Sequence, residues 1–159
     1  MEINTASMPS ASTAQVKYTS QPWFVNLSTD TQLEVGDMID LDGYPAYDIE
    51  DFISEFGEKA FTDGYYKTWE KLTNSEGHSE NAVRAFIDEF GIREIGSFAD
   101  SYVGQYPSEA AFAEEYFTEN YHLDVLSQAG ICVDWDTTWT NCLEPSYTWV
   151  GGYVFNNDF

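Results

Sequence analysis

Basic residues are scarce in this sequence: Lys and Arg together number 6 in 159 residues, against 28 Asp and Glu. The formal net charge is −22 at pH 7, and the stretch 94–159 contains no Lys or Arg at all. An acidic surface repels nucleic acids and anionic membranes, whereas it attracts basic partners. The charge therefore argues against direct binding of nucleic acid or membrane, and it favours a basic protein as the partner.

Cysteine and long apolar runs are scarce as well. Only Cys132 and Cys142 are present, so we expect two reduced thiols rather than a disulfide scaffold. No apolar run approaches the roughly 20 residues of a membrane-spanning helix. The N-terminus also lacks the basic and apolar regions of a secretory signal. These features predict a soluble, cytoplasmic protein.

The common catalytic and metal-binding motifs are missing too. The sequence has no HExxH, CxxC or GxSxG segment, so neither zinc at His78 or His122 nor a nucleophilic serine is expected. Asp40-x-Asp42-Gly43 resembles the start of a calcium loop, but the following positions depart from that pattern, which leaves only a non-specific cation site open. Carboxylate pairs occur in any chain this acidic and do not indicate a glycosidase. We expect no enzymatic activity, no metal and no cofactor.

Aromatic residues, by contrast, are abundant at 17% of the sequence. Disordered acidic chains are poor in such residues. The acids are dispersed, and their longest runs are the pairs Glu50-Asp51, Asp88-Glu89 and Glu114-Glu115. An acidic tail would show longer blocks. We therefore expect a folded protein with an acidic coat.

Hydrophobic periodicity and capping residues predict the order of the elements. Strands are expected at 22–27 and 33–41, the second broken at Gly36, and residues 1–15 are expected to form a disordered tail. Helices are expected at 48–58, 61–72, 79–90 and from Ser108 to about Asn120. Between and after these, the pattern predicts short helices at 97–103, 121–129 and 134–143, and strands at 131–133 and 152–155.

This pattern predicts an α+β fold, mostly helical with short antiparallel strands and arranged as an elongated chain of small α/β domains. The expected divisions are a tail at 1–15, an N-terminal α/β domain at 16–56, a helical middle segment at 57–97 and a C-terminal α/β domain at 98–159.

Pairs of acids one helical turn apart are the most informative feature. Asp51 and Glu55 form one such pair, and Glu115 and Glu119 form another. Residues so spaced have Cβ atoms about 5–6 Å apart, and each strand of DNA carries a phosphate every ~3.4 Å of rise. Since like-charged pairs destabilise a helix, a charge-dependent function is the simplest reason to keep them. An acidic coat can also serve solubility alone or an adaptation to high salt, and the charge pattern leaves both alternatives open.

Two parts of the chain resemble the antirestriction (ArdA) family of phages and mobile elements. The first is Pro22-Trp23-Phe24-Val25-Asn26-Leu27 followed by Gly36-Asp37-Met38-Ile39-Asp40-Leu41, which is similar to the opening strand of that family and its glycine-led segment. The second is an ordered series: Phe98-Ala99-x-x-Tyr102-x-Gly104-x-Tyr106-x-Ser108, Phe112-Ala113-Glu114-Glu115, Val133-Asp134-Trp135, Leu143-Glu144 and Gly152-Tyr153-Val154-Phe155. Met38 stands where the family tends to have Trp, and 57–97 matches poorly.

The resemblance implies a dimeric mimic of bent duplex DNA that inhibits type I restriction–modification enzymes. Such a protein fills the DNA groove of the specificity and methyltransferase subunits inside the host bacterial cell. The expected partner is therefore one of these enzymes or another DNA-binding protein. The alternative is an acidic adaptor that binds a different basic protein, such as an anti-CRISPR-like or histone-like target, without copying DNA.

The expected partner-binding residues are acids that stand in for phosphates. They are Glu50, Asp51, Glu55 and Glu58 on one helix, Glu109, Glu114, Glu115 and Glu119 on another, and Asp124, Asp134, Asp136 and Glu144 towards the C-terminus.

Overall fold

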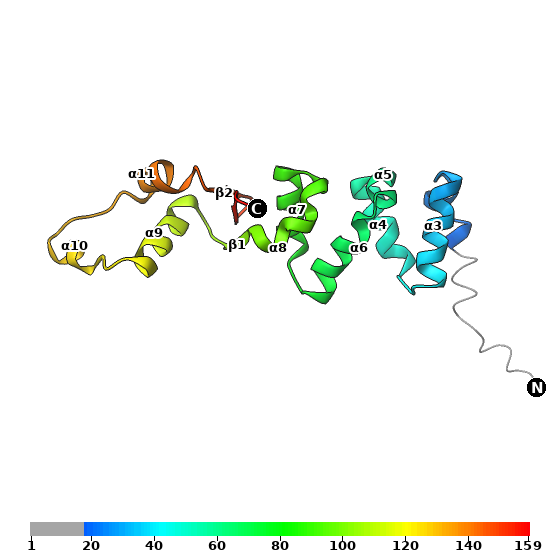
Figure 1. Ribbon diagram of the computed structural model, residues 1–159, viewed down its shortest axis with the longest axis horizontal. Coiled ribbons are helices and arrows are strands. Elements are labelled where there is room, and N and C mark those ends of the chain that lie inside the picture. Colours follow the sequence, from blue (N-terminus) through cyan, green and yellow to red (C-terminus); the bar gives the residue numbers. More distant parts are fainter. Residues whose placement is uncertain (1–17) are drawn as a thin grey trace, which may run out of the picture. The chain divides into compact units, whose positions relative to one another are not determined.

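The computed structural model describes residues 18–159, so the tail expected at 1–15 lies outside the described residues. The chain divides into two units between Lys67 and Thr68. Figure 1 labels its helices and strands. Most of the described residues are helical, and the second unit contains a three-stranded antiparallel sheet. The α+β class predicted from the sequence is confirmed.

The described part of the first unit is helical. Its helices are α2 (Pro22–Val25), α3 (Thr29–Asp40), α4 (Ala46–Phe56), α5 (Glu58–Thr62) and the start of α6 (Tyr65–Glu70). The strands predicted at 22–27 and 33–41 are therefore wrong, and so is the α/β character they gave to the expected N-terminal domain.

Local chemistry explains why helices form where strands were expected. Pro22 occupies the first turn of α2, a position that needs no backbone N–H. The Ser28 side chain caps α3 by accepting a hydrogen bond from the backbone N–H of Thr31. Thr31, Val35 and Met38 are buried at helical spacing, and Gly36 lies within this helix and does not break it.

Aromatic rings form the core of the first unit. Tyr66 is almost fully buried, and its ring lies 5.4 Å from that of Phe52 and 6.0 Å from that of Phe61. The helix predicted at 48–58 is present as α4, although Pro45 rather than Asp48 precedes it and it ends before Gly57. Gly57 has a φ of 96°, a conformation that favours glycine.

The helix predicted at 61–72 is not continuous. The chain turns at Gly64, which has a φ of 93°, and α6 then passes into a π-helical turn, η2 (Lys71–Ser75). In the second unit, α7 (Glu80–Phe90) confirms the predicted helix at 79–90. Ser79 caps its start by accepting from the Ala82 N–H, and Gly91 ends it with a φ of 97°.

The sheet of the second unit has the strand order β1-β3-β2. A 3₁₀ segment, η3 (Ile92–Ser97), and α8 (Phe98–Ser101) lead into β1 (Tyr102–Gln105), and β2 (Tyr147–Val150) and β3 (Tyr153–Asn156) form a hairpin. Gly151 and Gly152 both have positive φ, as a two-residue hairpin turn requires. The closing strand predicted at 152–155 is confirmed as β3, whereas β1 and β2 were not predicted.

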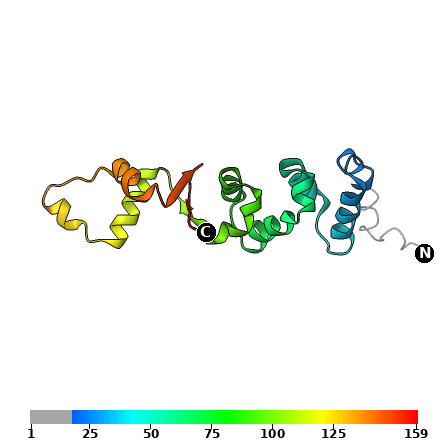
Figure 2. The ribbon, with the colours of Figure 1, turned by 45° about the horizontal axis from the view of Figure 1, so that its top comes forward.

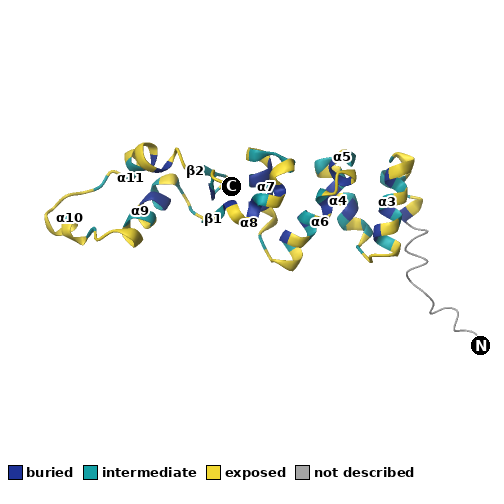
Figure 3. Cartoon of the chain, in the orientation of Figure 1, coloured by how far each residue is buried: buried dark blue, intermediate teal, exposed yellow. Residues whose placement is uncertain are grey.

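Two groups of side chains form the core of the second unit. Phe86 of α7 is fully buried, with ring contacts to Phe98 at 5.6 Å and Phe155 at 5.4 Å. A further cluster comprises Phe112, Ala113, Trp139, Leu143 and Val154. Figure 3 shows the buried positions along α7 and the exposed ones along α10.

The remaining elements of the second unit lie between β1 and β2 in the chain. They are α9 (Glu109–Asn120), α10 (Asp124–Gln128), α11 (Trp135–Thr138) and a π-helical turn, η4 (Trp139–Leu143). Ser108 caps α9 as predicted, since its hydroxyl accepts from the Ala111 N–H. The strand predicted at 131–133 is wrong, because these residues have no regular structure. Figure 2 shows α10 within a long connection between α9 and α11.

The packing of Phe86 predicts a large stability loss on truncation. Phe86→Ala removes a fully buried ring and leaves a cavity, so we expect it to lower the free energy of unfolding by about 3–5 kcal/mol. Urea unfolding followed by circular dichroism measures this. Val103→Ala is the control, because Val103 is 41% exposed. A loss no larger than that of the control would contradict the assignment of Phe86 to the core.

Candidate acidic interface

Three of the expected acids lie on α4. Asp51 and Glu55 are exposed one helical turn apart, and Glu50 is half-buried. The buried face of the same helix carries Ile49 and Phe52. The amphipathic pattern of α4 therefore directs the Asp51 and Glu55 pair away from the core, as the sequence predicted.

Glu58 does not share a helix with these acids, because α4 ends at Phe56 and Glu58 begins α5. Its carboxylate accepts hydrogen bonds from the Ser28 backbone N–H at 3.0 Å, the Ser28 hydroxyl at 2.5 Å and the Thr31 hydroxyl at 2.6 Å. These bonds, that of the Ser28 hydroxyl above all, hold the pKa of Glu58 below its ordinary value. Glu58 thus has a structural task, namely to tie α5 to the start of α3.

The acids of α9 form the most coherent group. Glu114, Glu115 and Glu119 are exposed and line one shallow depression, together with Ala111 and Thr118. Glu109 is exposed in the first turn, where a negative charge interacts favourably with the helix dipole. The helix predicted from Ser108 therefore presents Glu114, Glu115 and Glu119 on one open surface.

Glu115 also holds a tyrosine in place. The Tyr106 hydroxyl donates a hydrogen bond to the Glu115 carboxylate at 2.7 Å. Burial, this hydrogen bond and the nearby carboxylates raise the pKa of Tyr106 to about 12. The Tyr106 ring packs edge-on against Phe112 at 5.0 Å, so Glu115 connects the acidic surface to the core beneath it.

The last four acids are exposed but spread over several elements. Asp124 begins α10, Asp136 lies in α11 and Glu144 follows η4. Asp134 caps α11 by accepting from the Thr137 N–H at 3.1 Å and the Thr137 hydroxyl at 2.9 Å, which lowers the pKa of its carboxyl. The acids near the C-terminus thus do not form one patch on a single element.

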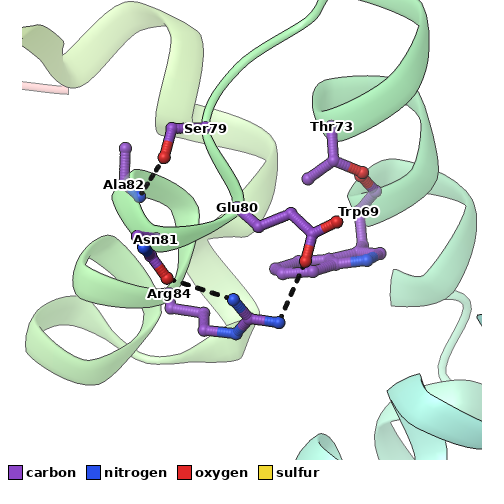
Figure 4. A network of polar contacts seen from close by, with 7 residues as sticks. All are labelled: Trp69, Thr73, Ser79, Glu80, Asn81, Ala82 and Arg84. Atoms are coloured by element: carbon purple, nitrogen blue, oxygen red, sulfur yellow. Dashed lines mark hydrogen bonds and ion pairs between the residues drawn. The ribbon is translucent and has the colours of Figure 1, made fainter.

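Three of the basic residues pair with acids outside the expected set. Lys59 pairs with Asp63 at 3.0 Å and Lys71 with Glu76 at 3.6 Å. The third pair, shown in Figure 4, joins Arg84 to Glu80 at 3.0 Å.

Arg84 also donates to the Asn81 side chain at 3.2 Å, and its guanidinium lies 5.4 Å from the centre of the Trp69 ring. The contact with Trp69 joins α7 to the end of α6 that belongs to the second unit. The cations that make these three pairs therefore serve the fold.

An apolar surface lies beside the acids at the end of α9 and the start of α10, and the sequence pattern did not predict it. Phe117, Tyr121, His122, Leu123, Val125 and Leu126 line a depression between the end of α9 and α10. Val125 is 62% exposed and Tyr121 is 57% exposed. The frequent apolar residues in 121–126 could have indicated an apolar surface. Their spacing alone, however, predicts only a further helical segment.

Two other classes of site find no support in the part of the chain that is described. Across 18–159, no His, Cys, Asp or Glu residues gather in a group of three or more that would suit a metal ion. Within the same range, every helix is too short or too polar to cross a membrane.

The contacts of Glu58 predict a pH-dependent contribution to stability. Because its folded pKa is lowered, that contribution is complete above the ordinary glutamate pKa of about 4.3 and is lost as pH falls through the lowered value. We expect Glu58→Gln to be less stable than the wild type at neutral pH, and the difference to shrink on acidification. Urea unfolding of both proteins across this range measures it.

Glu114→Gln is the matched control, since it removes the same charge from an exposed position. Its effect on stability at neutral pH should be smaller than that of Glu58→Gln. Equal effects from the two variants would mean that the hydrogen bonds to Ser28 and Thr31 contribute nothing beyond the charge.

Comparison with known proteins adds no relative. No protein-family model matches the chain, and neither a curated protein nor a solved structure matches it. Function therefore has to be inferred from the charges and surfaces of this chain itself.

Proposed function

We propose that this protein is a DNA mimic that occupies the DNA-binding groove of a type I restriction–modification enzyme and thereby inhibits it. One observation carries the proposal: the expected acids of the second unit, from Glu109 to Glu144, are exposed and lie on a stretch, 94–159, that contains no Lys or Arg. A surface of one sign over so long a stretch suits a partner that is itself built to hold phosphates.

The geometry of α9 supports this proposal. Glu115 and Glu119 are exposed one turn apart, and Glu114 lines the same depression. Carboxylates at this spacing, about 5–6 Å between Cβ atoms, come near the spacing of phosphates along a DNA strand, which follow one another every ~3.4 Å of rise on a path wound around the axis. The pair Asp51 and Glu55 on α4 repeats the arrangement in the first unit.

The energetics favour a DNA-binding partner over a neutral one. A protein that binds DNA neutralises phosphates with Lys and Arg, and binding gains from the release of counterions. An acidic protein uses the same basic residues of the partner without offering base edges, because phosphate contacts carry affinity but no sequence information. Such a decoy competes with DNA of any sequence.

The resemblance to the antirestriction (ArdA) family adds the partner and the setting. Its ordered series between Phe98 and Phe155 lies wholly within the second unit. By this resemblance, the proposal places the protein in the cytoplasm of a host bacterial cell as a non-enzymatic homodimer. Its partner is then the specificity and methyltransferase subunits of the enzyme.

A second candidate is an acidic adaptor that binds some other basic protein without copying DNA. The apolar depression beside α10 favours it, since a phosphate backbone presents no such surface. Competition separates the two: duplex DNA of any sequence displaces a mimic from its partner, whereas it leaves an adaptor bound to a different surface.

Cleavage of an unmodified plasmid by a type I restriction enzyme tests the proposal. We expect this protein to inhibit cleavage, and both excess competitor duplex and added salt to relieve the inhibition, because the contacts are electrostatic. A small type II enzyme serves as the control. No inhibition of the type I enzyme at large molar excess of the protein would contradict the proposal.

The acids should act together rather than singly. An exposed ion pair contributes only about 0.2–1 kcal/mol, so Glu114→Ala alone should leave inhibition nearly intact. The combined replacement of Glu114, Glu115 and Glu119 by Gln should weaken inhibition by about tenfold or more. Titration of the same plasmid assay with each variant measures both effects.

Asp88→Asn, Glu89→Gln and Glu94→Gln combined make a matched control, since they remove equal charge from exposed positions elsewhere in the second unit. An equal loss in this control would contradict the assignment of the α9 surface. Complete loss of inhibition from Glu114→Ala alone would contradict the distributed mechanism.

A further inference from the structure

The connection between α9 and α11 is unusual in a protein so rich in apolar residues. No side chain from Thr118 to Thr138 is buried, and α10, which lies within this stretch, has no buried residue. Figures 1 and 2 both show α10 standing away from α9 and α11. The apolar residues of α10 therefore do not contribute to the core, whereas Trp135 packs against it while only half-buried.

Some of these apolar residues nevertheless gather at one place. Val125 is 62% exposed and Tyr121 is 57% exposed. Val125 and Tyr121 line the depression between α9 and α10, together with Phe117, His122, Leu123 and Leu126. The depression has a volume of about 590 Å³, which lies within the range of ligand-binding pockets.

An aromatic stack gives this depression a firm wall. The Phe117 ring stacks on that of Tyr121 at 5.5 Å and on that of Trp135 at 6.4 Å. Phe117 and Trp135 in turn pack against the cluster that contains Phe112 and Trp139. The depression therefore has one wall on the core of the second unit, and its other wall, α10, carries exposed apolar residues. Contiguous apolar surface of this kind marks interaction sites.

The charges near the depression determine what can occupy it. Glu119 lies two residues before Tyr121, Asp124 directly precedes Val125, and both acids are exposed. His122 is the one lining residue that can become a cation. A second copy of this chain would bring acids against acids, and duplex DNA would be repelled. A partner segment that is both basic and apolar satisfies the charges and the apolar wall together.

We propose that the depression beside α10 binds a basic amphipathic helix of a partner protein. The apolar residues of that helix enter between Phe117, Val125 and Leu126, and its Lys and Arg face the surrounding carboxylates, Glu119 and Asp124 among them. Helix-in-groove recognition uses this division between an apolar contact face and charged flanks. The site goes beyond phosphate mimicry, because a DNA strand presents no apolar depression that a mimic could copy.

A synthetic helical peptide tests the proposal with the full-length protein. The probe carries a fluorescent label, with Leu at positions i, i+3, i+4 and i+7 and Lys elsewhere on its surface. The control peptide keeps every Lys and replaces each Leu with Gln. At physiological salt, we expect fluorescence anisotropy to show that the control binds at least about tenfold more weakly than the probe.

Variants of the protein locate the binding site. Val125→Ser with Leu126→Ser should weaken binding of the probe by about tenfold. The same double change at Leu33 and Leu41, which are 66% and 78% exposed in the first unit, should leave binding unchanged. Neither pair contains a buried residue, and far-ultraviolet circular dichroism checks that each variant is folded.

Three outcomes would overturn the proposal. The first is equal affinity for the two peptides, which would mean that charge alone binds them. The second is unchanged binding in the Val125→Ser/Leu126→Ser variant. The third is a dimer in sedimentation experiments that this variant abolishes, which would show that a second copy occupies the surface. None of these results depends on a restriction enzyme, so the proposed antirestriction function is judged separately.

Discussion

Repulsion among the carboxylates is the constraint that the rest of the structure has to satisfy. In a chain with a net charge of −22, repulsion among like charges destabilises the compact folded state. Burial of apolar surface has to outweigh this cost. Aromatic rings provide most of that burial, around Tyr66 in the first unit and around Phe86 and Phe112 in the second. Helices suit the purpose, because an amphipathic helix such as α4 or α9 directs its rings inward and its acids outward. The aromatic core thus stabilises the fold against the repulsion that the acidic coat creates.

Not every acid is available for a partner. Glu58 and Asp134 accept hydrogen bonds at the starts of α3 and α11, and Glu115 holds the Tyr106 hydroxyl. These groups reduce repulsion by interacting with backbone N–H and hydroxyl donors instead of cations, which are too few. The proposed phosphate mimics therefore differ in kind: some carboxylates face only solvent, while others also stabilise the fold beneath them.

Sequence patterns predicted the helices with strong caps and regular periodicity. Ser79 and Ser108 mark true helix starts, and the exposed positions of Glu114 and Glu115 follow from the phase of α9. The strands at 22–27 and 33–41 were wrong, because their apolar residues suit either structure and Gly36 is accommodated inside a helix. The role of Glu58 was beyond prediction, since it arises from contacts with Thr31 and Ser28, which precede it by 27 and 30 residues. Nor does sequence alone reveal that Val125 is exposed, because its exposure depends on whether another element of the fold packs against it.

The connection that carries α10 has a consequence for local motion. With no buried side chain between Thr118 and Thr138, opening this stretch exposes little new apolar surface, so it belongs to the low end of local stability. Its backbone amides should then exchange with deuterated solvent well before those of α7. Because the stretch contains no Lys or Arg, trypsin has no cleavage site in it at any degree of opening. A protease that cuts after Tyr and Leu, by contrast, has sites at Tyr121, Leu123 and Leu126. Resistance to trypsin would therefore reflect the composition of the stretch, whereas sensitivity to the second protease would reflect its local opening.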